Sequence, residues 1–380
     1  MKLSVLATRI LDQINPERTF SANVLGTNFE KSVLISYITP PFSNGRIKFT
    51  HSSSWEVVEI SKIFSELRYN VDIVRYNFDF EKVKFIKNKY DLVFGIDPNF
   101  FKAVNKFKPK KSIYYATSAY YKFQNKAEAA RLNDLKKRHS VLLPAVRKAE
   151  ESVSSDIADG VICFGNDWTK STYAGHYKKI ETIHTSAFGQ VNLGNIKPRN
   201  FTKAKKHFLW FGSIGAVHKG LDLLLEIFPK HSELTLHICG DVKREKDFAK
   251  LYHKELFETP NIILHGWVKP DSADYRTIVE NCAFTILPSC SEGMSGSVAT
   301  GMHAGLIPLV SRECGIDIGS CGEIFADNFI ETIEKVIMRY SQMDNKGVKY
   351  LSRCSFEQAK ENYTIGSFRD DFTSGLKKLL

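Results

Sequence analysis

Short apolar runs alternate with stretches of helical periodicity along most of the chain. In the first half, the apolar runs that predict strands are 32–38, 71–76, 91–96, 112–116, 160–164 and 182–187. Between the first two runs, Val57, Ile60 and Phe64 recur at helical spacing. Ser52 or Ser53 before them suits the N-cap of that helix. Strands that alternate with helices indicate a parallel sheet covered by helices.

The same alternation returns after 190–206, a stretch without apolar periodicity that we interpret as the interdomain connection. Strands of a second sheet are predicted at 207–211, 234–239, 261–265, 282–287 and 306–310. Helices are predicted at 221–228, 295–304 and 368–380, and Gly305 suits a C-cap of the second of these. The pattern predicts an α/β protein of two doubly wound, Rossmann-like domains that face each other across a central cleft.

Composition narrows the class of protein. The chain has 380 residues, 43% of them hydrophobic and 25% charged, which excludes a disordered, collagen-like or coiled-coil chain and favours two globular domains. No apolar run reaches the roughly 18 residues of a membrane span, and Leu3 to Ala7 is too short for a signal-peptide core. The seven cysteines form no CxxC pair, so we expect reduced core thiols and a cytoplasmic location.

The net charge of +11 suits a nucleic-acid binder, a membrane-surface protein or an enzyme with anionic substrates. We find no RNP motif, zinc-finger spacing or basic zipper, so no nucleic-acid partner is expected. The stretch 131–148 interleaves Lys and Arg with the apolar side chains Leu132, Leu135, Val141, Leu142 and Val146. It suits either peripheral contact with an anionic bilayer or a solvated helix face, and Pro144 breaks any single long helix there.

Candidate chemistry lies at three strand ends of the second half, because ligands of open α/β sheets bind at the carboxyl ends of the strands. The first end is FGSIGAVHKG, residues 211–220, with Lys219 at the start of a helix. The helix dipole disfavours a cation there unless a phosphate is bound, although a solvated lysine beside a glycine turn is the simpler alternative. The third end, HICGD at 237–241, has the small residue Gly240 for close ligand approach.

The second end is SCSEGMSG, residues 289–296, which follows a strand and opens a helix. Free amides at Met294, Ser295 and Gly296 would form an anion pocket at the helix N-terminus. Glu292 would accept hydrogen bonds from sugar hydroxyls held beside the phosphates, or it would simply cap the helix.

Four motifs of the second half occur in a familiar order, namely FGSIGAVHKGLDLLLEIF, HICGD, NIILHGWV and CAFTILPSCSEGMSGSVATGMHAGLIPLVS. The stretch from about Phe208 to Asp327 resembles the nucleotide-binding half of GT-B glycosyltransferases, most closely the retaining family 4 type. The resemblance implies that Glu292 contacts the donor sugar and Lys219 the donor diphosphate, both as catalytic residues. It implies a donor site formed by Gly212, Ser213, Gly215, Gly240, Trp267, Val268, Gly293, Met294, Ser295, Gly296 and Thr300, with Trp267 and Val268 beside the nucleobase.

The chain departs from the family pattern at two positions. Thr300 stands where the family has a second glutamate that holds both ribose hydroxyls, and one hydroxyl group cannot accept as a carboxylate does. Ser213 stands where the family has a basic residue. Both departures leave the identity of the nucleotide open. They also keep a decayed, non-catalytic glycan-binding protein as an alternative.

The first half resembles the family only loosely. On the acceptor side it offers Gly45, Arg46, His51 and Ser118, although a lone histidine such as His51 is more often structural. The residues alone point to no catalytic base. The resemblance implies an acceptor-binding domain at 1–195, a nucleotide-sugar-binding domain at 196–360, and a helix at 361–380 that returns to the first domain.

The expected function is transfer of a sugar from a nucleotide-sugar donor to an acceptor hydroxyl with retention, in the synthesis of a cell-envelope polysaccharide. The nucleotide sugar is a substrate, and we expect neither a cofactor nor a metal, because the sequence has no DxD motif or His/Cys ligand cluster. The expected acceptor is a glycan or a lipid-linked glycan, with peripheral contact at the inner face of the membrane. A non-hydrolysing nucleotide-sugar epimerase is the other enzymatic alternative.

Overall fold

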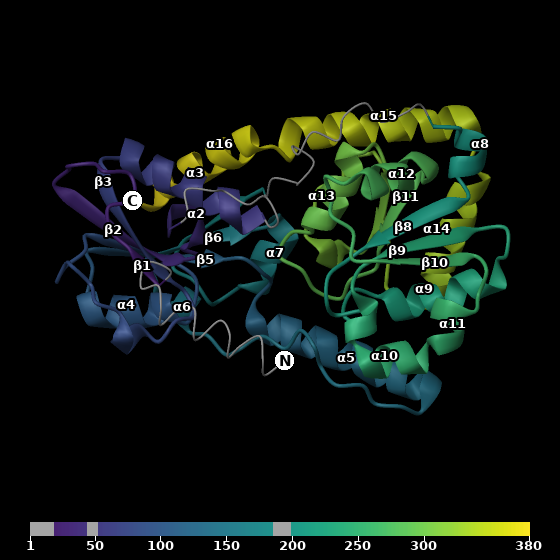
Figure 1. The fold of residues 1–380 in the computed structure, drawn as a ribbon, viewed down its shortest axis with the longest axis horizontal. Helices are drawn as coiled ribbons and strands as arrows, with labels where there is room; N and C mark the ends of the chain where they lie inside the picture. Colours follow the sequence, from purple (N-terminus) through teal and green to yellow (C-terminus); the bar gives the residue numbers. More distant parts are fainter. Residues whose placement is uncertain (1–18, 44–51, 185–198) are drawn as a thin grey trace.

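The computed structural model describes residues 19–43, 52–184 and 199–380, which form two α/β domains (Figure 1). The strands of the first domain are β1 (Phe20–Ser21), β2 (Lys31–Tyr37), β3 (Tyr69–Arg75), β4 (Leu92–Gly95), β5 (Lys111–Ala116), β6 (Gly160–Phe164) and β7 (Ile180–Ile183). Those of the second domain are β8 (His207–Phe211), β9 (Thr235–Cys239), β10 (Ile262–Gly266), β11 (Phe284–Leu287), β12 (Ile307–Val310) and β13 (Glu323–Ile324).

The first sheet has the order β1-β3-β2-β4-β5-β6-β7, in which only β1 runs antiparallel to its neighbour. The second sheet is parallel throughout, with the order β10-β9-β8-β11-β12-β13. In the second sheet the order reverses between β8 and β11, as in a doubly wound dinucleotide-binding sheet. The predicted fold class, two doubly wound domains, is therefore confirmed.

The helices pack on the faces of these sheets and connect them. In the first half they are α2 (Pro40–Ser43), α3 (Ser52–Glu66), α4 (Asn99–Phe107), α5 (Tyr121–His139), α6 (Ser154–Ile157) and α7 (Asp167–Thr172). In the second half they are α8 (Phe201–Ala204), α9 (Leu221–Ile227), α10 (Lys246–Leu251), α11 (His253–Phe257), α12 (Ala273–Asn281), α13 (Gly296–His303), α14 (Ile330–Gln342), α15 (Asn345–Asn362) and α16 (Ile365–Leu379). Within the described ranges, no helix is long and apolar enough to span a bilayer.

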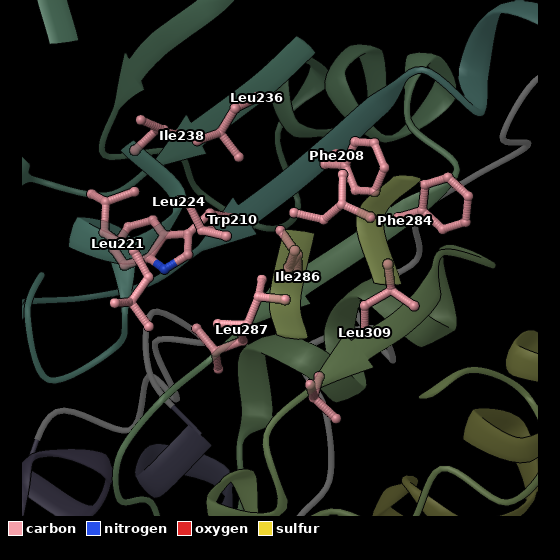
Figure 2. Close-up of a cluster of buried hydrophobic side chains, with 14 of the residues drawn as sticks. Phe208, Trp210, Leu221, Leu224, Leu236, Ile238, Phe284, Ile286, Leu287 and Leu309 are labelled. Carbon is pink, nitrogen blue, oxygen red and sulfur yellow. The ribbon is translucent and has the colours of Figure 1, made fainter. Parts of the chain in front are cut away.

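The apolar runs became strands because both faces of each sheet are covered, so that consecutive residues are buried. Figure 2 shows this for the second sheet, where Phe208, Trp210 and Phe284 pack with leucine and isoleucine side chains from neighbouring strands and from α9. The indole of Trp210 is fully buried, and its Nε1 donates to the carbonyl oxygen of Lys219 at 3.1 Å. The core thus reaches the loop that follows β8.

Three local predictions can be compared directly with the structure. All seven cysteines are free, and all but Cys354 are buried, as predicted. Gly305 follows α13 with a left-handed φ of +71°, as a C-cap glycine requires. The connection predicted at 190–206 is not irregular throughout, because α8 lies within it; Asn200 caps this helix by accepting from the amide of Lys203. The end of the strand predicted at 182–187 lies outside the described residues.

The amphipathic stretch at 131–148 does not offer its whole apolar side to a bilayer. Helix α5 ends at His139, and its Leu132 and Leu135 are buried in the core of the second domain. Arg138 forms ion pairs there with Asp222, at 2.7 Å, and with Glu226. Figure 1 shows α5 running from the first domain along the second. The amphipathic pattern therefore reflects a contact between the domains.

The last helix also joins the domains. After α15, which packs on the second domain, α16 crosses back and places Phe368, Phe372 and Leu376 in the core of the first domain (Figure 1). His184, just after β7, is sandwiched between a carboxylate of α16 and one of the second domain. Its Nδ1 lies 2.6 Å from Asp371 Oδ2, and its Nε2 lies 3.6 Å from Asp317 Oδ2.

The His184 contact predicts a pH dependence of stability. Hydrogen bonds to Asp317 and Asp371 raise the pKa of His184 from its ordinary value of 6.5 to about 9. Because the pKa of His184 is higher in the folded than in the unfolded state, its protonation stabilises the fold. This contribution is fully present below pH 6.5 and disappears as the pH rises through 9. We expect the thermal unfolding midpoint of the wild type to fall across this window and that of His184→Gln to fall less. His253→Gln, at an exposed histidine, is the control; identical pH curves for wild type and His184→Gln would contradict the assignment.

Candidate active site

The two loops that carry the candidate catalytic residues meet where the strand order of the second sheet reverses. The loop at 212–220 follows β8, and the loop at 288–295 follows β11, its neighbour in the sheet. From these two strands the chain continues in opposite directions, to β9 on one side and β12 on the other. A crevice at the carboxyl ends of the strands is the general ligand site of doubly wound sheets.

Lys219 and Glu292 form an ion pair between these two loops. Both side chains are largely buried, with exposed fractions of 7% and 11%. The loops can approach so closely because Gly220 has a left-handed φ of +70°, and a Cβ there would lie 2.2 Å from the carbonyl oxygen of Pro288. The amide of Cys290 also donates to the carbonyl oxygen of His218 at 2.8 Å. The structure thus brings together the two residues predicted to be catalytic.

The surroundings of Glu292 keep its carboxylate ionised. Burial raises the pKa of this carboxyl group, but the positive charges of Lys219, His218 and Arg147 outweigh it and hold the pKa at about 2. Ser289 Oγ also donates a hydrogen bond to Glu292 Oε1 at 3.1 Å. At neutral pH Glu292 is therefore a hydrogen-bond acceptor and not a proton donor.

His218 is a further buried group of this site that sequence reasoning did not single out. Its Nε2 lies 2.5 Å from the carbonyl oxygen of Ser291, which can only accept, so Nε2 carries the proton. Burial lowers the pKa of His218, and its Nδ1 has no hydrogen-bond partner among the described residues. The imidazole therefore serves to join the two loops, next to the ion pair.

Part of the predicted amide pocket is wrong. The amide of Ser295 is not free, because it donates to the carbonyl oxygen of Cys314 at 2.9 Å, and Met294 also has an interaction partner. Helix α13 begins one residue later, at Gly296, with Ser295 as its N-cap residue. The end of α13 that faces the site therefore starts at Gly296, and the backbone of Ser295 is used to hold the loop in place.

The loop after β8 likewise uses its amides internally. The carboxylate of Glu245 accepts from the amide of Gly215 at 2.6 Å and from that of Ala216 at 3.0 Å. Gly212 and Gly240 lie against each other and against the Trp210 ring, so that a Cβ at Gly240 would be 2.7 Å from the Gly212 carbonyl oxygen. These glycines are needed for packing at the strand ends, whatever the ligand.

The remaining residues of the predicted donor site lie on different elements of the second domain. Ser213 is exposed on the loop after β8, while Trp267 is 63% exposed and Val268 is buried just after β10. Thr300 is fully buried on α13, and its Oγ1 donates to the carbonyl oxygen of Gly296 at 2.7 Å. The Thr300 hydroxyl group is therefore already bonded within its own helix.

On the acceptor side, Gly45, Arg46 and His51 lie outside the described residues. Ser118 lies at the end of β5, directly against the loop of Glu292, since a Cβ at Gly293 would meet the Thr117 carbonyl oxygen at 2.7 Å. From the first domain, Thr169 Oγ1 donates to the carbonyl oxygen of Gly293 at 2.7 Å. Through both contacts, the first domain packs against Gly293, the glycine that follows Glu292.

A cavity of about 430 Å³ lies between the two domains beside this contact. Glu56 and Tyr37 line it from the first domain, and Met294 and Gly296 from the second. Glu56 is buried and accepts a hydrogen bond of 2.8 Å from the Tyr37 hydroxyl group. Burial raises the pKa of Glu56 to about 7. Sequence reasoning missed this carboxyl group, because it lies on an ordinary amphipathic helix.

The described part of the chain contains no group of three or more His, Cys, Asp or Glu side chains arranged to hold a metal ion. The candidate site consists of a buried cation and a buried carboxylate, next to the contact of Gly293 with the first domain.

Comparison with known proteins agrees with this geometry. Residues 205–353 match the family described as glycosyl transferases group 1. A sucrose-phosphate synthase from Thermosynechococcus elongatus superimposes with a TM-score of 0.62 at 11% identity, covering 92% of this chain and 98% of that one. Anabaena HepE in complex with UDP-glucose gives 0.61 at 11%, covering 92% and 99%. The catalytic domain of starch synthase IV from Arabidopsis thaliana, bound to ADP and acarbose, gives 0.57 at 11%, covering 93% and 99%. No curated protein sequence matches the chain.

The fold is therefore GT-B, and residues 205–353 of the second domain match the glycosyl transferases group 1 family. The resemblance drawn from the sequence motifs is confirmed at this level.

The buried ion pair predicts a strong energetic coupling between the two loops. Removing one partner leaves the other charge buried and unpaired, so we expect Lys219→Met and Glu292→Gln each to lower the free energy of unfolding by about 3–5 kcal/mol. The double variant Lys219→Met/Glu292→Gln should lose much less free energy of unfolding than the sum of the two single losses, because no unpaired charge remains. Urea unfolding of the four proteins measures the coupling. Additive losses would mean that the two side chains do not interact.

Proposed function

We propose that this protein is a glycosyltransferase that transfers a sugar from a nucleotide-sugar donor to an acceptor hydroxyl group, with retention at the anomeric carbon. The observation that carries the proposal is the buried pair of Lys219 and Glu292 at the carboxyl ends of β8 and β11. Retention rests on the resemblance of the second domain to retaining family 4 enzymes.

Lys219 is suited to stabilise the leaving group. When the bond between the anomeric carbon and the diphosphate breaks, negative charge develops on the diphosphate oxygens. A preorganised donor at such a position contributes about 2.7–4 kcal/mol to transition-state stabilisation. Trp210 holds the main chain of Lys219, and Glu292 holds its ammonium group, so the lysine is preorganised before the donor binds.

Glu292 is suited to orient the donor sugar. With a pKa of about 2 its carboxylate is ionised at neutral pH, so it accepts hydrogen bonds from sugar hydroxyl groups without taking part as an acid. One of its oxygens, Oε1, already contacts Lys219 and Ser289. The carboxylate thus links the sugar and the diphosphate ends of the donor site.

The donor we propose is a nucleoside-diphosphate sugar. The complexes of Anabaena HepE with UDP-glucose and of the starch synthase with ADP support this class. Thr300 provides a buried hydroxyl group and no carboxylate for the ribose. The thermal-shift screen therefore covers sugars of several nucleotides.

The acceptor we propose is a glycan, free or lipid-linked, of the cell envelope. A groove of about 770 Å³ on the first domain has several aromatic side chains, among them Tyr114, Tyr121 and Phe101. It shares Tyr76 and Thr117 with the cavity of about 430 Å³ beside α13, so the two hollows are neighbours. Aromatic side chains with an apolar ring and a polar edge suit sugar rings.

A thermal-shift screen of UDP-, GDP-, ADP-, CMP- and dTDP-sugars tests the proposal. A donor present at 100 times its Kd should stabilise the protein by about 2.7 kcal/mol. Lys219→Met should lower kcat/KM by about 10²–10³, the effect of removing one preorganised donor, and Glu292→Gln should also lower it. Lys230→Met and Glu331→Gln, at exposed positions of the same domain, are the controls.

The alternatives give other results in the same screen. Binding of no nucleotide at all would favour the decayed glycan-binding protein. Conversion of the donor sugar to its epimer without any acceptor would favour a nucleotide-sugar epimerase. Turnover at wild-type rates in both site variants would contradict the assignment of Lys219 and Glu292.

We also propose that the protein binds peripherally to an anionic membrane at its cytoplasmic face. Val141 and Leu142, directly after α5, are 40% and 60% exposed beside the basic end of that helix. We expect co-flotation with anionic but not neutral vesicles, and weaker flotation of Val141→Ser/Leu142→Ser. Phe329→Ser, at an exposed apolar residue of the second domain, is the control. Equal recovery with neutral and anionic vesicles would contradict the preference for anionic lipid, and no recovery with either would contradict membrane binding.

A further inference from the structure

Arg147 of the first domain lies over the loop that follows β8. Gly215 of this loop has a left-handed φ of +103°, and a Cβ there would lie 2.5 Å from Arg147 Cγ and 3.1 Å from Arg147 Cδ. The aliphatic part of the arginine therefore rests on the loop backbone, in space that any side chain at position 215 would fill. Glycine at this position makes room for an arginine that comes from the other domain.

Helix α5 fixes the main chain of Arg147. The amide of Arg147 donates to Glu128 Oε1 at 2.8 Å, and its carbonyl oxygen accepts from Gln124 Nε2 at 2.6 Å. Both partners are buried on α5. The same helix is attached to the second domain, since Arg131 Nη2 donates to the Pro288 carbonyl oxygen at 3.1 Å. The backbone of Arg147 is thus held at a set position relative to both loops of the site.

The loop beneath Arg147 has little positive potential of its own to offer an anion. Glu245 occupies the amides of Gly215 and Ala216, so these amides are not free to bind an anion. Arg147 is exposed, and its guanidinium forms no ion pair with a described residue. Arg244 and Lys246 line the same side of this loop, and Arg244 is paired with Asp241 at 2.6 Å. Arg147 adds an unpaired guanidinium to this basic surface.

Electrostatic effects agree with the position of Arg147. Burial has the largest effect on the pKa of Glu292 and raises it, and the charge of Arg147 is among those that reverse this shift. Burial likewise dominates the pKa of His218, and Arg147 lowers it further. The guanidinium therefore acts on the groups around the ion pair from across the domain boundary.

We propose that Arg147 binds the diphosphate of the donor, so that the first domain supplies a cation to the leaving group. This inference rests on the proposed function and adds a residue to the same site. A guanidinium presents its donors in a planar fork that matches two phosphate oxygens at once. Because the chain segment of Arg147 belongs to the first domain, donor binding would tie the two domains together at the loop after β8.

Calorimetric titration with UDP and with inorganic pyrophosphate tests the inference on the full chain. Loss of a charge-assisted hydrogen bond should weaken binding of both ligands about ten- to a hundredfold in Arg147→Gln. Binding of UMP, which lacks the second phosphate, should change less. A structural role alone would not separate UDP from UMP. Arg147→Lys, which keeps the charge but not the fork, should bind UDP more tightly than Arg147→Gln. Lys148→Gln, at the exposed neighbouring residue, should bind like wild type.

Each contrary outcome has a distinct meaning. Wild-type protein that binds pyrophosphate and every nucleoside diphosphate of the screen no better than buffer contradicts the proposed function, and the inference fails with it. Wild-type protein that binds UDP, together with Arg147→Gln that binds it equally well, overturns the inference alone. An equal loss of affinity in Lys148→Gln also overturns the inference, because the effect would then reflect the net charge of the segment.

Discussion

The ion pair between Lys219 and Glu292 is the interaction on which the site depends. Two charges removed from water are tolerated only when each has a partner and further hydrogen bonds. The protein meets this requirement by bringing two loops into contact, with Gly220 giving the close approach and Ser289 adding a hydrogen bond. The pair therefore holds the two loops in one geometry and keeps the Glu292 carboxylate ionised.

The relative position of the two domains follows from contacts far apart in the sequence. Helix α5 carries Leu132 and Leu135 into the core of the second domain, and α16 carries Phe372 into that of the first. Between these two crossings, Gly293 lies against Thr117 with no space for a side chain. The residue after Glu292 is thus part of the domain interface, so that a change in the angle between the domains would act directly on the ion-pair loop.

The sequence predicted most strands, and it placed Lys219 and Glu292 at strand ends of the second sheet, because these features depend on local patterns and on the geometry of parallel sheets. It could not predict that Glu56 and Arg147 lie beside the other domain, since each looks like an ordinary residue of its own segment. The stretch at 131–148 was open to two interpretations for the same reason: an amphipathic pattern says that one side is covered but not by what. The amide of Ser295 illustrates a further limit, because its partner, the Cys314 carbonyl oxygen, lies on another loop.

Thr300 occupies the position at which the sequence resemblance implies a second glutamate. A carboxylate at a fully buried position on α13 would need a cation or a ligand hydroxyl to compensate its desolvation. The threonine hydroxyl group finds its partner four residues back along its own helix, at the Gly296 carbonyl oxygen. The Thr300 hydroxyl group is therefore satisfied within its own helix, without a ligand.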